Sequence, residues 1–450
     1  MKIPRALTIA GSDSGGGAGI QADLKTFSAF GVYGMTAITA LTAQNTMEVK
    51  DIYPVSPKFL ELQIDAIMED IGVDAAKTGM LYSSILVETA AKKVREYRIR
   101  TIVDPVMVAK SGKRLLDKDA VETMKRKLIP EALILTPNIP EAEILLGYRI
   151  KDFEKAAEDL SEMGVEAVVI KGGHLKNGEV IDLLYYKGKS YIFKKERIKT
   201  RNTHGTGCAF SAAITALIAK GKSIPEAVGE ASEFMERTIK FSLPIGRGYG
   251  PVNPMIDLYH KAEKYIAWKN VSKALEIIED SPELIPLIPE VRMNIGEAST
   301  YAETVNDICA VEGRISIVNG RLRGAGCPKF GASKHVARII LAAMKMDRRM
   351  KAAMNIKYDD KIILACRELG LKIAQFRREE EPLEIKQVEG GTLKWGVEKA
   401  FKEVGETPDI IFDKGEKGKE PMIRILGEDA LKVVLKAKKI GKKILKDLSA

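Results

Sequence analysis

The chain is poor in the residues that build metal clusters, disulfide frameworks and aromatic binding platforms. Its 450 residues include only four cysteines and four histidines, and no two cysteines form a Cys-x-x-Cys pair. This excludes the usual zinc-site spacings and favours reduced thiols, so we expect a cytoplasmic protein. Aromatic residues make up 6% and do not alternate with basic clusters, which argues against a stacking platform for nucleic acid.

Long apolar runs are also missing. The apolar stretch at residues 6–10 ends at Gly11, far short of a signal peptide's apolar region or of the ~20 residues that span a bilayer, and we expect a first buried strand there. The lysine-rich stretch 429–448 has apolar residues at helical spacing. That spacing predicts a packed helix with a basic outer face; association with a membrane surface is the alternative.

The positive charge is unevenly distributed. The net charge is +10; residues 1–260 carry 35 basic and 32 acidic side chains (+3), whereas residues 261–450 carry 36 and 29 (+7). The second half is therefore the better candidate for an anionic ligand. The alternative is a solvated, lysine-rich surface of a heat-stable protein, which the count of five glutamines also fits.

The first half alternates short β-branched runs with helical patterns. We expect strands at 7–10, 37–41, 74–79, 101–104, 133–136 and 167–171, and helices at 20–30, 57–70, 83–97, 117–128 and 154–163. This rhythm predicts a mostly parallel sheet with helices on both faces. A stretch rich in glycine and proline at 243–254 marks a boundary, so we expect a first domain over 1–250, a linker with connecting helices over 251–284, and a second, smaller α/β domain over 285–450.

Three of the expected strands run directly into chemically reactive residues. Asp104 ends one strand and Lys171 ends another, while Asn138 and Glu141 follow the strand between them. In a parallel sheet these side chains converge on one rim, where carboxylates and an amide suit hydrated Mg²⁺ and a lysine suits a transferred phosphate. Asn138 and Glu141 could instead cap a helix, and Lys171 could be an exposed charge. We predict phosphoryl transfer from a nucleotide, with Mg²⁺.

Two glycine-rich turns open helices in this half. The segment Gly11–Gly19 precedes a helix, as does Asn202-Thr-His-Gly-Thr-Gly-Cys208. The amides of Gly205 to Cys208 form an unsatisfied helix N-terminus and thus an anion hole, and the helix is expected to stop at Gly221. There the dipole favours a Cys208 thiolate that accepts a proton from a substrate hydroxyl. A small packing residue is the alternative for Cys208, and a flexible turn for the first loop.

These motifs resemble the hydroxymethylpyrimidine/phosphomethylpyrimidine kinases of thiamine biosynthesis. The resemblance covers residues 3–250 and lies in Ala6–Thr26, Thr42-Ala-Gln-Asn45, Lys77-Thr-Gly-Met80, Asp104-Pro-Val-Met107, Lys171-Gly-Gly-His174 and Asn202–Cys208. It implies a ribokinase-like fold and ATP-dependent phosphorylation of 4-amino-5-hydroxymethyl-2-methylpyrimidine (HMP) to its monophosphate and diphosphate. Ser14 departs from the proline that related sequences often carry.

The resemblance also assigns residues. It implies that Gln44 recognises the aminopyrimidine edge, that the ring lies among Gly11, Ala18, Met80 and Val106, and that Cys208 is the base. Together with the chemistry above, the predicted catalytic residues of this half are Lys171, Gly205, Gly207 and Cys208; the predicted nucleotide-binding residues are Asp104, Asn138, Glu141 and Thr206; and the predicted metal ligands are Asp104 and Glu141.

The second half concentrates arginine, lysine and glycine over residues 312–338. Ser333 reads as the N-cap of a helix whose first turn contains Lys334 and His335, and cations there oppose the helix dipole unless an anion is bound. Arginines such as Arg314 suit a diphosphate. Anion binding is thus predicted, with a basic surface loop as the alternative.

Residues 285–450 resemble an archaeal thiamine-phosphate synthase domain. The likeness lies in Glu312-Gly-Arg-Ile315, Gly326–His335 and Ala352–Tyr358. It implies joining of HMP diphosphate to a thiazole phosphate with release of pyrophosphate, a reaction whose main demand is neutralisation of the leaving group. The predicted residues are Arg314 and His335, supported by Arg321, Arg323 and Lys334; Asp413 is a weak candidate for binding Mg²⁺, since its loop also reads as a solvated turn.

Two rival functions remain open at this point. The first half shares much of its chemistry with pyridoxal kinases, and the second half resembles a domain that also serves as a ligand sensor without catalysis. The expected partners are small molecules, namely HMP, its phosphates and thiazole phosphate, with no nucleic acid and no membrane. We also expect a homo-oligomer.

Overall fold

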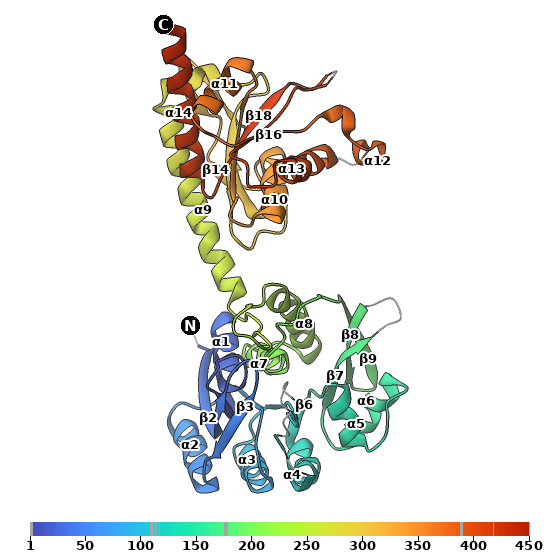
Figure 1. Cartoon of the computed structure of the whole chain (residues 1–450). Coiled ribbons are helices and arrows are strands. Elements are labelled where there is room, and N and C mark those ends of the chain that lie inside the picture. The colour runs from blue at the N-terminus through green and yellow to red at the C-terminus, as the bar shows by residue number, and fades with distance from the viewer. Residues whose placement is uncertain are drawn as a thin grey trace. The chain divides into compact units, whose positions relative to one another are not determined.

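The computed structural model describes residues 3–108, 112, 115–116, 118–174, 179–387, 390–416 and 418–449, and the chain divides into two compact units, residues 1–257 and 258–450 (Figure 1). The expected linker at 251–284 is not a separate segment. Val252 packs in the core of the first unit, whereas Val271, Ala274 and Leu284 pack in the core of the second. The spacing of Val271, Ala274 and Ile278 places all three on one face of a helix, which explains their burial.

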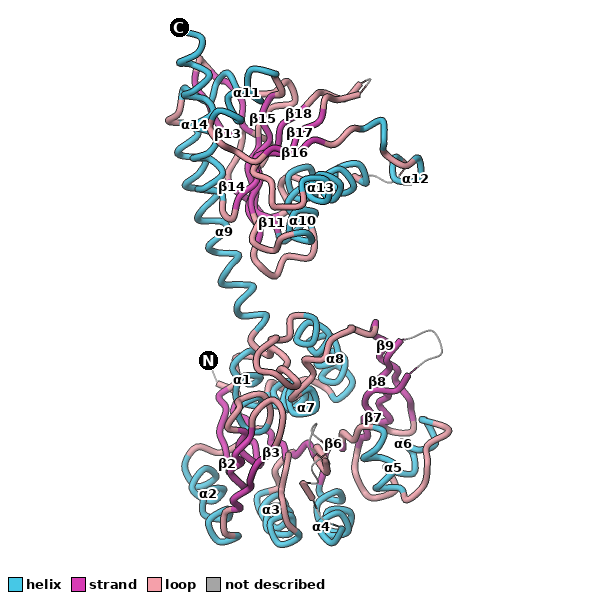
Figure 2. The backbone as a smooth tube through the Cα atoms, viewed as in Figure 1, coloured by secondary structure: helices cyan, strands magenta, loops and turns pink. Residues whose placement is uncertain are grey.

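In the first unit, the described strands form one nine-stranded sheet in the order β3-β2-β1-β4-β5-β6-β7-β8-β9 (Figure 2). Their bounds are β1 (Arg5–Asp13), β2 (Tyr33–Gln44), β3 (Val49–Pro54), β4 (Ala75–Thr78), β5 (Thr101–Val103), β6 (Ala132–Leu135), β7 (Ala167–His174), β8 (Glu179–Tyr186) and β9 (Lys189–Glu196). The six strands from β2 to β7 in this order pair in parallel, and β3, β8 and β9 join antiparallel. The parallel strands are the six that the sequence predicts.

Helices cover both faces of this sheet. They are α1 (Gly19–Ala29), α2 (Pro57–Asp70), α3 (Ser84–Tyr97), α4 (Lys118–Thr123), α5 (Ile139–Leu146), α6 (Phe153–Ser161), α7 (Thr206–Ala219) and α8 (Ile224–Lys240). Helices α2 to α6 lie on one face, and α1, α7 and α8 lie on the other (Figure 1). The helix expected at 117–128 is α4 continued by a π-helical turn, Met124–Leu128.

The alternation of side chains along the short central strands builds these two cores. In β5, Ile102 packs with α7 and α8 while its neighbour Val103 packs with the opposite helices, and Ile134 and Leu135 of β6 divide in the same way. All four side chains are fully buried. A strand covered on both faces therefore has a continuous apolar sequence, and this pattern predicts these strands.

The second unit contains a seven-stranded sheet in the order β14-β11-β10-β15-β18-β17-β16 and a hairpin of β12 and β13. The bounds are β10 (Asn294–Ala298), β11 (Ile308–Val311), β12 (Ile315–Val318), β13 (Arg321–Gly324), β14 (Pro328–Phe330), β15 (Ala352–Lys357), β16 (Ile373–Gln375), β17 (Ile410–Asp413) and β18 (Met422–Gly427). In the larger sheet only β16 and β17 pair in parallel among the described strands. The second α/β domain is thus mostly antiparallel.

Helices also lie on both faces of the second sheet. They are α9 (Ile256–Glu279), α10 (Lys334–Met346), α11 (Asp360–Glu368), α12 (Leu383–Lys386), α13 (Gly391–Val404) and α14 (Ala430–Ser449), with 3₁₀ turns at Pro282–Leu287, Val305–Asp307 and Arg378–Glu380. Helices α9, α11 and α14 lie on one face of the sheet, and α10 and α13 lie on the other (Figure 1). The side chains of each set pack in a separate core. Among the helices in the described ranges, none has both the length and the apolar character needed to span a membrane.

Two glycines at opposite ends of α7 allow a test of how tightly its N-terminus is packed. Gly205 and Gly221 both have left-handed backbones, with φ of +80° and +86°. A Cβ on Gly205 would lie 1.9 Å from the carbonyl oxygen of Gly17, whereas a Cβ on Gly221 would meet nothing within 4 Å. We expect Gly221→Ala to lower the free energy of unfolding by about 1–2 kcal/mol and Gly205→Ala by at least about 3 kcal/mol. Calorimetric unfolding of both variants measures this difference. Equal losses of unfolding free energy would show that the loop containing Gly17 is not in close contact with Gly205.

Candidate active sites

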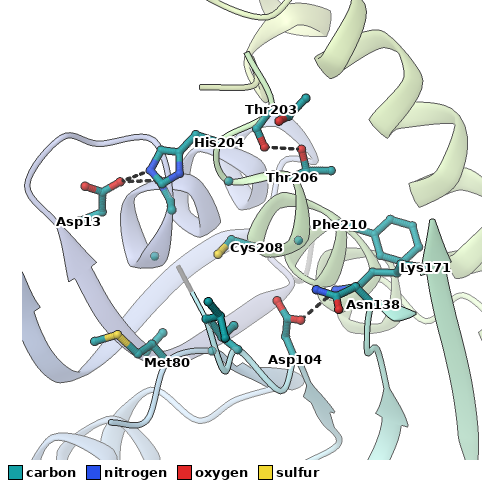
Figure 3. A pocket seen from close by; sticks show the side chains of 18 of the residues that line it. Asp13, Met80, Asp104, Asn138, Lys171, Thr203, His204, Thr206, Cys208 and Phe210 are labelled. Atoms are coloured by element: carbon teal, nitrogen blue, oxygen red, sulfur yellow. Dashed lines mark hydrogen bonds and ion pairs between the residues drawn. The ribbon is translucent and has the colours of Figure 1, made fainter. Parts of the chain in front are cut away.

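One cavity of about 760 Å³ lies at the carboxyl ends of the parallel strands in the first unit (Figure 3). The structure brings together there all the residues that the sequence analysis assigns to this half: Gly11, Ala18, Gln44, Met80, Asp104, Val106, Asn138, Glu141, Lys171, Gly205, Thr206, Gly207 and Cys208. They converge because β1, β4, β5, β6 and β7 are parallel and end at one edge of the sheet. Their individual roles remain predictions.

An ion pair occupies the wall below the N-terminus of α7. The ammonium of Lys171 lies 2.9 Å from Oδ1 of Asp104 (Figure 3). The hydroxyl of Ser211 donates to Oδ2 of Asp104 at 3.3 Å. Lys171 is thus not an exposed charge. Burial acts to lower the pKa of Lys171, but the carboxylates of Asp104 and Glu141 outweigh burial and raise it. The lysine is therefore held as a cation inside the cavity.

Asn138 and Glu141 both cap a helix and line the cavity. They form a capping box at α5: Oδ1 of Asn138 accepts from the Glu141 amide, and Oε2 of Glu141 accepts from the Asn138 amide, both at 2.9 Å. Both side chains also line the cavity. Burial, with a smaller contribution from Asp104, raises the pKa of Glu141 to about 7. The capping alternative is thus correct, and it does not remove either residue from the cavity.

Cys208 lies in the first turn of α7, and its thiol points toward the interior of the cavity (Figure 3). The prediction that the helix terminus favours the thiolate is wrong for this structure. Burial raises the pKa of Cys208 to about 11, and the nearby carboxylates of Asp23 and Asp104 act in the same direction, whereas Lys77 opposes them. The partial charge of a helix terminus does not compensate for this loss of solvation.

A second buried cation lies beside this thiol. Lys77, which ends β4 together with Thr78, lines the cavity and pairs with Asp23 of α1 at 2.9 Å, with both side chains fully inaccessible. The hydroxyl of Thr8 also donates to Asp23 at 2.7 Å. Burial alone acts to lower the pKa of Lys77, but Asp23, Cys208 and Asp104 together raise it. Lys77 therefore places a permanent positive charge behind Cys208.

Asp13 connects the loop after β1 to the loop before α7. Its Oδ2 accepts from the amides of Gly17 and Ala18 at 3.0 and 2.8 Å and lies 2.9 Å from Nε2 of His204 (Figure 3). Burial opposes ionisation, but the hydrogen bonds from His204 and from backbone amides lower the pKa of Asp13 overall. The side-chain amide of Gln44 lies 3.3 Å from the same His204 nitrogen. These contacts hold Gln44 at the cavity wall.

A second cavity, of about 360 Å³, lies in the second unit. Arg314 and His335 line it together with Arg292, Asn294, Asn355, Arg378, Lys419, Glu420 and Arg424, among others. Burial lowers the pKa of His335 to about 4, and the charges of Arg424, Arg314 and Arg378 add to this effect. The imidazole is therefore neutral at physiological pH within a strongly cationic cavity.

Three of the predicted supporting cations do not reach this cavity. Arg321, Arg323 and Lys334 are exposed and are absent from its lining. In β13, alternation buries Leu322 and turns both flanking arginines outward, and Arg323 pairs with Glu279 at 2.7 Å. Lys334 occupies the first turn of α10 next to His335, but adjacent residues on a helix point about 100° apart.

Asp413, the last residue of β17, fits neither sequence interpretation. It is fully buried, and its Oδ1 accepts from Nε of Arg378 at 2.6 Å while its Oδ2 lies 2.8 Å from Nη1 of Arg424. It is therefore neither a solvated turn nor a carboxylate open to Mg²⁺. Its two arginine partners were not expected from the sequence, because neither stands in a recognisable motif.

Comparisons with known proteins assign a different family to each of the two units. Residues 13–253 match the phosphomethylpyrimidine kinase family, and residues 270–439 match thiamine-phosphate synthase ThiN. Over 441 residues the chain is 33% identical to the bifunctional thiamine biosynthesis protein ThiDN of Methanocaldococcus jannaschii, covering 97% of this chain and 98% of the relative. The chain belongs to this ThiDN family. Residues 1–257 are called the kinase unit below, and residues 258–450 the ThiN unit.

The kinase unit has further relatives of known type. It is 50% identical over 258 residues to the hydroxymethylpyrimidine/phosphomethylpyrimidine kinase of Bacillus subtilis, covering 56% of this chain and 95% of the relative. It also resembles the structure of Bacillus subtilis pyridoxal kinase in an ADP complex, with a TM-score of 0.53 and 40% identity, covering 56% of this chain and 98% of that one. The expected ribokinase-like α/β fold is confirmed.

Several cavity residues of the kinase unit were not assigned from the sequence. Asp13, Lys77 and His204 stand inside the quoted motifs, which was the signal that could have found them. Asp182 and Lys195 gave no such signal. They lie on β8 and β9, whose antiparallel pairing with β7 was not expected, and they form an ion pair that lines the same cavity.

The raised pKa of Glu141 predicts a pH-dependent stability. In the unfolded chain a glutamate titrates near ~4.3, whereas Glu141 in the folded chain titrates at about 7. Its contribution to stability is thus complete below pH ~4.3 and is lost as the pH rises through about 7. When the pH rises from 5 to 8, wild type should lose up to about 3 kcal/mol more of the kinase unit's free energy of unfolding than Glu141→Gln, because glutamine does not ionise.

Calorimetric unfolding of the kinase unit at both pH values measures this difference. The control is Glu154→Gln, an exposed glutamate on α6. If Glu141→Gln and Glu154→Gln follow the wild-type pH dependence equally, Glu141 is ionised throughout this range.

Proposed function

We propose that the kinase unit transfers phosphoryl groups from ATP to HMP and then to HMP monophosphate. One observation carries this proposal: Lys171, the N-terminus of α7 and the Cys208 thiol converge in a single cavity that also contains the Gln44 amide. This combination supplies a cation and amide donors for a migrating phosphoryl group, a proton acceptor, and a polar group that can select a ring. The name of the Bacillus subtilis relative supports the same substrates.

The proposed pyrimidine pocket is the part of the cavity around Gln44. Its amide can both donate to and accept from the aminopyrimidine edge. The pocket depends on a close approach, because a Cβ on Gly11 would lie 2.7 Å from the terminal methyl of Met80. Any larger residue at position 11 would push Met80 toward the ring. Ala18 and Val106 complete the small apolar surface that a methylated pyrimidine needs.

The proposed nucleotide region lies beyond Lys171. Asp104, Asn138, Glu141 and Thr206 supply polar groups there, and Val180, Phe210, Met235 and Ile239 add apolar surface to the same cavity. No cluster of three metal-ligating side chains occurs among the described residues. Two carboxylates are available, because Asp104 lies close enough to Glu141 to raise its pKa. Magnesium commonly binds proteins through one or two carboxylates together with water and phosphate oxygens. Bound there, it would offset the charge of the transferred phosphate.

Cys208 is the proposed base for the first transfer. Burial raises the pKa of the Cys208 thiol to about 11, so the thiol must first lose its own proton to solvent; Lys77 stabilises the resulting thiolate, which then accepts the proton of the HMP alcohol. The alcohol of HMP must lose a proton during the first transfer, whereas the attacking phosphate oxygen in the second transfer is already ionised. The base is therefore needed in only one of the two steps.

Cys208→Ala should separate the two transfers. We expect the first to slow by at least about 100-fold and the second by less than about tenfold, and we expect the wild-type rate of the first transfer to rise between pH 7 and pH 9. Single-turnover assays with HMP and with HMP monophosphate measure each step. Cys327→Ala, which removes an exposed thiol, is the control. Equal losses in both steps would leave Cys208 as part of the anion hole only.

The ThiN unit is proposed to join HMP diphosphate to thiazole phosphate. Arg314 and His335 line the cationic cavity, as neutralisation of departing pyrophosphate requires. Arg314 holds a left-handed backbone, with φ of +75° after Gly313 at +69°, and its guanidinium donates to the carbonyl of Val291. A strained, hydrogen-bonded arginine at a cavity is consistent with a functional position.

The second activity is tested by following intermediates in the full chain. With HMP, ATP, Mg²⁺ and thiazole phosphate, wild type should release thiamine phosphate and pyrophosphate, whereas His335→Ala should accumulate HMP diphosphate and lose at least about 100-fold in product formation. Chromatography of the quenched reaction measures all species. Accumulation of the diphosphate by wild type would favour the alternative, a ThiN unit that senses thiamine phosphates without turnover.

A pyridoxal kinase remains the alternative for the first unit, because the structural resemblance to the Bacillus subtilis pyridoxal kinase favours it specifically. Competition between HMP and pyridoxal for turnover distinguishes the two. The expected homo-oligomer and the cytoplasmic location also stay predictions.

A further inference from the structure

A buried charge cluster lies beneath the ThiN cavity and is formed by Asp413, Arg378 and Arg424. The exposed fractions of these residues are 0%, 9% and 0%. They come from three elements that are separate in the sequence: Asp413 ends β17, Arg424 lies in the neighbouring strand β18, and Arg378 opens a 3₁₀ turn. Only folding brings the three charges together.

The cluster holds both guanidinium groups in fixed orientations. Asp413 accepts from Nε of Arg378 at 2.6 Å and from Nη2 at 3.4 Å, and it lies 2.8 Å from Nη1 of Arg424. The buried ring of Phe376 lies beside both, with its centroid 5.3 Å from Cζ of Arg424 and 6.0 Å from Cζ of Arg378. An arginine that is paired and stacked in this way loses little further freedom when it binds a ligand.

The charge of the cluster is not balanced. One carboxylate faces two guanidinium groups, and Nε and Nη2 of Arg424 have no hydrogen-bond partner among the described residues. Nε2 of His335 is likewise buried without a partner. Buried donors without acceptors are costly, and more so when they belong to a charged group. Because Arg378, Arg424 and His335 all line the cavity, an anion there would supply the missing acceptors.

We propose that Arg378 and Arg424 form the receptor for the pyrophosphate leaving group, with Arg314 and His335 completing it. This inference rests on the function proposed for the ThiN unit. The bond between the pyrimidine methylene carbon and the diphosphate oxygen breaks, and its electron pair leaves with pyrophosphate. The lone pair of the thiazole nitrogen then forms the new C–N bond, giving a thiazolium cation. The receptor stabilises the charge that develops on the departing oxygen.

Inorganic pyrophosphate and inorganic phosphate are the probes for this receptor, titrated calorimetrically into the full chain. We expect wild type to bind pyrophosphate more tightly than phosphate, because several fixed guanidinium groups match two linked phosphates. Arg378→Met should weaken pyrophosphate binding at least tenfold. The matched control, Arg367→Met, removes an exposed arginine of α11 in the same unit and should change the affinity less than twofold.

A second variant guards against misfolding. Arg424→Lys keeps a cation for Asp413 but removes the planar set of donors, so thermal unfolding should remain close to wild type while pyrophosphate binding falls at least tenfold. Retention of wild-type affinity in both Arg378→Met and Arg424→Lys would overturn the proposal, and so would the absence of pyrophosphate binding by wild type. A preference for phosphate that these variants abolish would assign the arginines to the thiazole phosphate instead, which also contradicts it.

The same variants separate this inference from the function on which it rests. Thiamine phosphate formation is measured in parallel for each protein. If wild type binds pyrophosphate through Arg378 and Arg424 but makes no thiamine phosphate, the synthase function fails while the anion receptor stands. If the chain makes thiamine phosphate and both variants do so at wild-type rate and affinity, the function stands and the receptor fails.

Discussion

The contact between Asp13 and the loops around it is the interaction on which the kinase cavity depends. One carboxylate oxygen accepts from the amides of Gly17 and Ala18 and contacts His204, so it joins the loop after β1 to the loop that starts α7. The helices that these loops open, α1 and α7, also pack against each other through Phe27, Ala212 and Ala216, so the Asp13 contacts fix the loops at the end of an already packed helix pair. The close approach of Gly17 to Gly205 lies beside these contacts and makes glycine necessary at position 205.

The two cavities handle buried charge in opposite ways. In the kinase unit, lysines are matched by carboxylates: Lys77 pairs with Asp23, and Lys171 pairs with Asp104. In the ThiN unit, the buried guanidinium groups of Arg378 and Arg424 share one carboxylate, that of Asp413. In a lysine–carboxylate pair, a phosphate can replace the carboxylate beside the lysine while a metal ion binds the carboxylate. Guanidinium groups in excess over carboxylates instead suit a leaving group whose negative charge increases as its bond breaks. The uneven net charge of the two halves is consistent with this difference.

The parts of the structure that could be predicted are those with a clear apolar pattern or motif in the local sequence. The six central parallel strands could be predicted because burial on both faces makes them continuous apolar runs, and the cavity residues of the kinase unit could be predicted because they follow those strands within motifs. The antiparallel strands β3, β8 and β9 were not predicted. Exposed residues dilute the apolar pattern of the edge strands β3 and β9. Strand β8 lies between β7 and β9 with four buried residues at its centre, so its run of apolar residues was a usable signal. Arg378 and Arg424 were not predicted because they are far apart in the sequence: β18 pairs with β17, and the 3₁₀ turn that contains Arg378 packs against Asp413 at the end of β17. The pKa of Cys208 was misjudged because it depends on tertiary burial rather than on the helix terminus alone.

The donors of Arg424 that lack acceptors also make the stability of the ThiN unit depend on the anion that binds there. A ligand that binds the folded chain but not the unfolded chain adds RT ln(1 + [L]/Kd) to stability, so each tenfold excess over Kd contributes about 1.4 kcal/mol. If the ThiN unit carries an uncompensated buried cation, the folded fraction of that unit follows the concentration of the anions it handles. Enzyme abundance would then respond to the diphosphate pool through protein turnover, with no separate regulatory domain.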